Sequence, residues 1–370
     1  MSAPEPTAAP FRWDGDLDRR RERARSRATI VFVAGVLIQA AYAATLACIL
    51  LFAAARFQTF WTGDPLGDSP LWRYGLAGAG IFALGAFVLT LGFTLLGAVR
   101  GAATWLLKGL TLRPGTEDEL RRLRNVVDAL AMGLGVAPPE ILLIDEPTPN
   151  TISCRRGDDR TLCVTTGVLE LPRHEIEAMC AHEIAQLHAP DSKLVSAAFM
   201  ALLRARNASG AIGGIGALLV VLAVGAALKA EIFLPSMFLV GCALAGASFL
   251  ALMLLMSPLY WVREAVVDLA DVAAVHLARH PTALASVLGR LAENERRVAT
   301  TTERCELLWF EAVEVVFATE DVESTDATGK KSKTKRVDPK RLAAANQRSR
   351  TELERRAALV TATARGIRVG

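Results

Sequence analysis

Charged residues are missing from four long stretches of this 370-residue chain. The sequence is 52% hydrophobic and has a mean hydropathy of +0.32, which is more apolar than an ordinary soluble protein. The uncharged stretches are residues 28–55, 74–99, 207–228 and 232–260. Each is long enough to cross a bilayer. The composition therefore argues against a soluble enzyme and predicts a mainly α integral membrane protein with four transmembrane helices.

Cysteine pairs with C-x-x-C spacing are also missing. The chain has six cysteines, of which two lie within predicted spans and the rest in regions that we expect in the cytoplasm. Thiols stay reduced in that compartment. We therefore interpret the cysteines as small apolar residues that fill space rather than as disulfide partners.

Positive charge predicts the orientation of the chain. Six arginines lie between residues 19 and 27, whereas the loop 57–72 contains no Lys or Arg. Because positive residues accumulate on the cytoplasmic side of spans, we expect a multi-pass protein of the inner (plasma) membrane with both termini inside. A cleaved signal peptide is not expected, since the first apolar run is too long and follows a long polar leader. The arginines need no nucleic acid partner, because their place beside a span explains them.

The alternation of polar and apolar segments predicts the order of regions. We expect a disordered basic leader at 1–27, transmembrane helices one and two at 28–99, the first part of a cytoplasmic domain at 100–206, a transmembrane hairpin at 207–260, the second part of that domain at 261–319, a flexible insertion at 320–340 and a C-terminal helix at 341–370. The insertion is rich in Glu, Asp, Ser, Thr and Lys and has no aromatic residue, a composition typical of exposed flexible segments.

The polar regions predict a small α+β domain. A capping box at residues 116–119 opens an amphipathic helix. Short strands are predicted at 141–144, 151–154 and 161–165. Pro172 suits the first turn of the helix that follows.

That following helix carries the first candidate site. It contains Ala-His-Glu-Ile-Ala-Gln at residues 181–186, one residue short of H-E-x-x-H. In that motif two His residues hold zinc and the Glu activates water. His182 and Gln186 share a helix face, but Gln186 stands where the second His belongs. An amide oxygen is a poorer zinc donor than an imidazole nitrogen.

A second candidate site lies on the helix after the fourth span. Glu264, Asp268 and Asp271 follow one another at helical spacing among Val, Leu and Ala. Carboxylates on an apolar helix need a cation, a His or a metal as partner. Spacing alone leaves two interpretations open: a metal site, or a solvated stripe that pairs with Arg263 and Arg279. In the same way, His182 alone is compatible with a purely structural role.

Several segments together resemble the HtpX-like membrane metallopeptidases, which belong with the CAAX prenyl protease in metallopeptidase family 48. They are Pro149–Ile152, Val164–Leu171, Glu175–Glu183 and Arg263–Asp268, with a weaker match at Glu352–Arg356. The resemblance covers roughly residues 30–295. It implies a cytoplasmic zincin-like domain with one zinc ion, and membrane or misfolded proteins as substrates.

The resemblance also implies a role for each matching residue. His182, Gln186 and Glu264 would hold zinc, Glu183 would be the general base, Asp268 would orient a ligand imidazole, Asp191 matches an acidic position after the zinc helix, and Asn150 would border the substrate groove.

Three functions remain open from the sequence. The preferred one is a zinc-dependent endopeptidase that is impaired by Gln186. The alternative is a pseudoprotease that binds or escorts membrane proteins without cleaving them. A structural or transport role is the third, and transport is disfavoured because the spans hold no ionisable residue.

Overall fold

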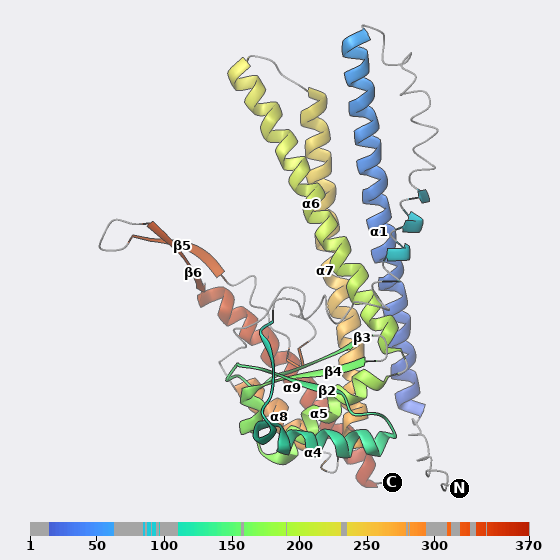
Figure 1. Ribbon diagram of the computed structural model, residues 1–370, viewed down its shortest axis with the longest axis vertical. Coiled ribbons are helices and arrows are strands. Elements are labelled where there is room, and N and C mark those ends of the chain that lie inside the picture. Colours follow the sequence, from blue (N-terminus) through green and yellow to red (C-terminus); the bar gives the residue numbers. More distant parts are fainter. Residues whose placement is uncertain are drawn as a thin grey trace. The chain divides into compact units, whose positions relative to one another are not determined.

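The computed structural model describes residues 15–62, 84–85, 87–89, 91–93, 96, 110–156, 159–189, 191–230, 235–278, 280, 282–293, 309–311, 319–325, 331–337 and 339–369. The chain forms two compact units (Figure 1). The polar unit comprises Met1–Ala24, Gly101–Ser192 and Arg263–Gly370, and the apolar unit comprises Arg25–Arg100 and Lys193–Val262.

Long helices supply most of the apolar unit, and their ends belong to the polar unit. They are α1 (Gly15–Thr62), α6 (Ser192–Ala230) and α7 (Pro235–Leu277). Within the described residues, three segments of these helices are long and apolar enough to cross a membrane: Leu17–Thr45, Ser192–Gly225 and Phe238–Leu277. They overlap the first, third and fourth predicted spans. The predicted span at 74–99 lies largely outside the described residues.

Glycine allows α6 and α7 to approach closely. A Cβ on Gly216 would lie 2.7 Å from the backbone nitrogen of Ala245 and 2.8 Å from the carbonyl oxygen of Gly241. Backbone atoms cannot move aside as a flexible side chain can, so only glycine fits there. A Cβ on Gly210 or Gly214 would meet nothing within 4 Å.

Two helices begin earlier in the chain than the sequence predicts. The leader that we expect to be disordered is helical from Gly15 onward, and Leu17 and Ala24, seven residues apart on one face of α1, are buried. The helix that we expect to begin near Arg263 is continuous with the fourth span, since α7 runs through Pro258 without ending.

A four-stranded mixed sheet lies in the polar unit. Its strands are β1 (Leu112–Pro114), β2 (Glu140–Ile144), β3 (Thr151–Arg156) and β4 (Asp159–Thr165), in the order β1-β2-β4-β3. β2 and β4 are parallel, and the other two pairs are antiparallel. The three predicted strands are confirmed. β1 is too short to leave a pattern in the sequence.

Helices of the polar unit pack around one core. They are α4 (Glu117–Leu134), α5 (Arg173–His188), α8 (Ala283–Glu293) and α9 (Pro339–Val369), with a short 3-10 helix, η2 (Thr166–Glu170), before α5. α5 contacts α4, α8 and β3, and its residues Ile176, Met179 and Ile184 are among the largest fully buried side chains. Because α5 is covered on several sides, the polar residues that it carries on those sides are withdrawn from solvent together with the apolar ones.

The predicted capping box of α4 is confirmed. The backbone nitrogen of Thr116 donates to Glu119 Oε2 at 2.8 Å, and the backbone nitrogen of Glu119 donates to Thr116 Oγ1 at 3.4 Å. The helix ends at Gly135, whose φ of 67° lies in the left-handed region.

The expected flexible insertion at 320–340 contains an antiparallel hairpin. β5 (Thr319–Thr325) pairs with β6 (Lys331–Val337) in a separate two-stranded sheet. The register sets Asp321 opposite Lys335 and Glu323 opposite Lys333. Composition alone does not reveal that register.

Candidate functional site

His182 and Glu183 lie in the middle of α5 and are withdrawn from solvent. The exposed fraction is 1% for His182 and 0% for Glu183. A buried ionisable group costs folding free energy unless hydrogen bonds or opposite charges compensate it. The partners of these two side chains therefore define the site.

The imidazole of His182 is held by a carboxylate on α7. Its Nδ1 lies 2.8 Å from Oδ1 of the buried Asp271. An ionised carboxylate only accepts hydrogen bonds, so Nδ1 carries the proton and donates it. The residue that orients His182 is thus Asp271, three residues beyond the predicted Asp268.

Arg356 of α9 neutralises Asp271. Its Nε lies 2.7 Å from Asp271 Oδ2 and its Nη2 lies 2.8 Å from Oδ1, so the pair is bidentate. The guanidinium is 0% exposed. Burial alone would lower the pKa of Arg356, but the charge and hydrogen bonds of Asp271 raise it above its ordinary value.

Phe310 completes the surroundings of His182. Its ring meets the imidazole edge to face, with centroids 4.8 Å apart. The guanidinium carbon of Arg356 lies 4.5 Å from the centroid of the same ring, and its Nη1 donates to the Phe310 carbonyl at 2.6 Å. We call these four residues, His182, Asp271, Phe310 and Arg356, the histidine–arginine cluster.

Glu183 has a different partner on the sheet. The hydroxyl of Thr151 on β3 donates to Glu183 Oε1 at 2.8 Å. In the described part of the chain, Oε2 of Glu183 is buried without a hydrogen-bond partner. A buried carboxylate oxygen that lacks a hydrogen-bond donor costs folding free energy. Such groups in native proteins often belong to ligand or catalytic sites.

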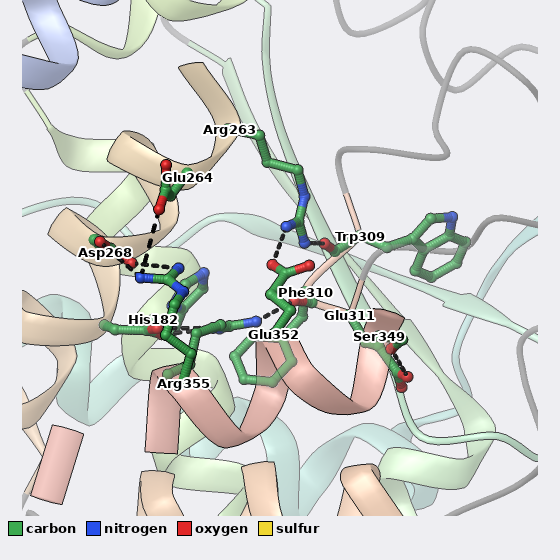
Figure 2. Close-up of polar contacts among 12 residues, drawn as sticks. His182, Arg263, Glu264, Asp268, Trp309, Phe310, Glu311, Ser349, Glu352 and Arg355 are labelled. Atoms are coloured by element: carbon green, nitrogen blue, oxygen red, sulfur yellow. Dashed lines mark hydrogen bonds and ion pairs between the residues drawn. The ribbon is translucent and has the colours of Figure 1, made fainter. Parts of the chain in front are cut away.

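The predicted ligand Glu264 and its neighbour Asp268 face Arg355 of α9, as Figure 2 shows. Asp268 accepts two hydrogen bonds from Arg355, at 3.1 and 2.8 Å. Glu264 Oε1 lies 3.8 Å from Arg355 Nη1, and its side chain is 49% exposed. Of the two interpretations left open by the sequence, ion pairing describes these carboxylates, and their cation is Arg355.

The other predicted residues are Asp191, Gln186 and Asn150. Asp191 pairs with Arg21, whose Nε lies 2.8 Å from Asp191 Oδ2. Gln186 is half-buried on α5, one turn after His182. Asn150 is buried beside β3 and binds the backbone of Glu311. The structure therefore brings His182 together with Asp271, and Glu264 together with Asp268, in two different settings.

The donor set does not fit a catalytic zinc site. Such a site needs three protein ligands from His, Cys, Asp or Glu. Residues that the structure describes include no group of three such side chains placed to hold a metal ion. Glu264 lies two turns before Asp271, roughly 10 Å along the helix axis at about 1.5 Å per residue. Among the predicted ligands, His182 alone is a histidine, and its contact with Asp271 is the kind of carboxylate contact that metal-binding histidines make.

Arg356, Phe310 and Thr151 belong to the site but are not among the residues predicted from the sequence. Arg356 carried a signal: it lies between Leu353 and Val360, at the helical spacing of the buried face of α9. A charged residue in an apolar stripe requires a buried partner of opposite charge. Phe310 and Thr151 carry no comparable signal.

The fold and the site together indicate which class of protein the chain is similar to. The chain combines apolar helices long enough to cross a membrane with a polar unit whose core helix carries a buried His-Glu pair beside a small mixed sheet. Proteins named Protease HtpX homolog are similar to it. No family model and no solved structure matches the chain.

Three of these relatives show how far the similarity extends. The relative from Dictyoglomus thermophilum is 31% identical over 124 residues, which is 32% of this chain and 41% of the relative. That from Caldanaerobacter subterraneus subsp. tengcongensis is 26% identical over 217 residues, covering 56% of this chain and 70% of the relative. That from Dictyoglomus turgidum is 34% identical over 85 residues, covering 22% and 28%. The similarity thus spans less than half of both Dictyoglomus relatives.

Proposed function

We propose that this protein is an HtpX-like membrane pseudoprotease, which holds segments of membrane or misfolded proteins without hydrolysing them through zinc. The observation that carries the proposal is the hydrogen bond between His182 and Asp271. It supports the assignment of Asp271 as the carboxylate that orients the imidazole, and this assignment implies which residue of α7 would stand in the position of the third ligand.

In the resemblance described above, the third ligand stands four residues before the orienting Asp. Four residues before Asp271 is the buried Val267, one turn away on the same face of α7. Valine has no ligating atom. Gln186 already replaces the second His, so two of the three ligand positions lack an imidazole or a carboxylate.

The histidine–arginine cluster offers a role for His182 that needs no metal. Asp271 accepts from His182 on α5 and from Arg356 on α9, so one buried carboxylate joins three helices. Buried ion pairs add little net stability, but they penalise any arrangement in which a partner is removed. The cluster would keep α5, α7 and α9 in one register and preserve the peptidase-type fold.

The setting that we propose follows from charge and hydropathy. The protein is a multi-pass protein of the inner (plasma) membrane, with both termini and the polar unit in the cytoplasm. Its partners are the lipid bilayer and segments of membrane or misfolded proteins, and it does not bind nucleic acid. The arginines at 19–27 and the three apolar helices support this placement.

Restoring the missing ligands tests the proposal. The natural protein in detergent should leave casein intact, with or without added zinc. The double variant Gln186→His/Val267→Glu supplies an imidazole and a carboxylate at the two deficient positions, and we expect it to bind zinc. Gln186→His/Val267→Gln is the matched control, because it adds a side chain of similar size with a weaker donor.

A second candidate, a zinc-dependent endopeptidase, is favoured by one observation: Glu183 is retained, and its buried Oε2 lacks a donor in the described chain. Cleavage of casein by the natural protein, abolished by a chelator and by Glu183→Gln, would establish this candidate and refute the pseudoprotease.

A further inference from the structure

Arg27 of α1 is held against Trp261 of α7 within the apolar unit. Its Nη1 donates to the carbonyl of Trp261 at 2.8 Å, and its guanidinium carbon lies 4.7 Å from the centroid of the indole ring. A hydrogen bond and a cation–π interaction together give the guanidinium a defined position. We call Arg27 and Trp261 the interfacial pair.

Trp261 lies where aromatic residues mark the surface of a membrane. It directly follows the uncharged stretch 232–260, whose last residue is Tyr260. The exposed fraction is 38% for Tyr260 and 41% for Trp261. Trp and Tyr at the end of a span gather at the level of the lipid headgroups, because one end of each side chain is apolar and the other polar. We therefore place the interfacial pair at that level.

An exposed apolar face of α1 begins one turn after Arg27. Its residues Ile30, Val33 and Leu37 are 53%, 47% and 53% exposed. They follow Arg27 at intervals of three or four residues, so they lie on one side of the helix. Such side chains cost free energy in water but not among acyl chains. The order along α1, with the cation first and the apolar face next, matches a phospholipid from its phosphate to its acyl chains.

The chemistry around the interfacial pair favours a negatively charged headgroup. Arg27 is one of six arginines between residues 19 and 27, and basic residues beside a span attract anionic lipids. A guanidinium presents five N–H donors in a planar fork that fits phosphate oxygens. The indole ring already holds a cation, so a choline ammonium at the same ring would meet a like charge.

We infer that the interfacial pair binds the headgroup of an anionic phospholipid, and that the apolar face of α1 takes an acyl chain of the same molecule. Arg27 donates to the phosphate, and Trp261 fixes the guanidinium that does so. The inference goes beyond the proposed function and does not depend on it, because lipid binding requires neither a metal nor cleavage.

Retention of lipid by the purified full chain tests the inference. The protein in detergent is mixed with equal amounts of dioleoyl phosphatidylglycerol and dioleoyl phosphatidylcholine, and native mass spectrometry counts the molecules of each that stay bound. We expect the natural protein to retain phosphatidylglycerol in preference. One arginine at a membrane surface changes the affinity for anionic lipid roughly fivefold, so Arg27→Gln should weaken the retention of phosphatidylglycerol by about that factor.

Arg25→Gln is the matched control. It removes the same charge from an exposed position of the same helix, but two helical residues rotate Arg25 about 160° away from Arg27. This variant should retain phosphatidylglycerol almost as well as the natural protein. Arg27→Lys keeps the charge without the planar fork, and its retention should fall between those of Arg27→Gln and the natural protein.

A second variant guards against a loss of folding in Arg27→Gln. Trp261→Leu removes the ring that positions the guanidinium but keeps every charge, and it should also weaken the preference for phosphatidylglycerol. Circular dichroism and thermal melting identify the variants that remain folded. Size-exclusion chromatography with light scattering reports the oligomeric state of each.

Three results would overturn the inference. Equal retention of the two lipids by the natural protein would show that the headgroup charge is not recognised. Equal losses in Arg25→Gln and Arg27→Gln would mean that unspecific charge, rather than a site, attracts the lipid. Unchanged lipid retention in folded Arg27→Gln would leave the interfacial pair a packing contact, and a dimer that this variant converts to a monomer would then assign the surface to a second copy of the chain.

Discussion

Removal of the buried guanidinium at Arg356 should destabilise the polar unit strongly. Arg356→Met keeps most of the volume of the side chain but takes away the positive charge that neutralises Asp271. The carboxylate would then be left at 0% exposure with His182 as its one remaining partner in the cluster. A buried charge without compensation is among the most costly defects in a folded protein.

The magnitude follows from the burial of the pair. Breaking a buried ion pair by removing one partner costs about 3–5 kcal/mol, whereas an exposed pair contributes about 0.2–1 kcal/mol. The neighbouring Arg355 provides a matched control, since it pairs with Asp268 at 2.8 Å but is 40% exposed. Arg355→Met should therefore cost about 1 kcal/mol or less.

Hydrogen exchange of the α5 and α9 amides, in detergent, measures the opening free energy of each variant. Asp271→Asn/Arg356→Met removes both charges and should recover part of the loss of Arg356→Met. Equal costs for Arg356→Met and Arg355→Met would mean that Asp271 does not depend on a buried cation, contrary to the expectation.

Three further changes test other contacts. Thr151→Val removes the hydroxyl that donates to the buried carboxylate on α5 and should cost about 1–3 kcal/mol by hydrogen exchange; Thr151→Ser should cost less, and equal costs would count against the hydrogen bond. Gly216→Leu should lower the melting temperature in detergent because of the close backbone atoms of α7, whereas Gly214→Leu should not; equal melting temperatures would contradict the packing. Hydrogen bonding to Arg113 and the cap lowers the pKa of Glu119 from 4.5 to about 2, so its stabilisation is complete above about pH 4.5 and is lost as the pH falls towards 2. Glu119→Gln should abolish that pH dependence of amide protection at the start of α4.

Local patterns predicted the elements of the polar unit well. The capping box at Thr116 is a contact between residues three apart, so its signal is complete within one turn of helix. The strands at 151–154 and 161–165 are short apolar runs bounded by turns, and they pair with each other in the structure. The hairpin at 319–337 escaped prediction, because a strongly biased composition does not reveal which residues of two strands face each other.

Prediction of the site reached His182 and Glu183 but not their partners. Asp268 and Asp271 are three residues apart, and hence about one turn apart on nearly the same face of α7. Spacing cannot decide which of them meets His182, because that depends on which turn of α7 packs beside α5. Arg356 and Phe310 come from segments far along the chain, and their place in the cluster is a consequence of tertiary packing.

In the proposed function, His182 is bound to Asp271 in an ion-paired cluster and does not serve as one of three zinc ligands. The measurement that tests it most directly is the zinc content of the purified full chain after equilibration with zinc and removal of loosely bound metal. We expect no tightly bound zinc, and no difference between the natural protein and His182→Ala. About one zinc ion per chain, lost in His182→Ala, would contradict it.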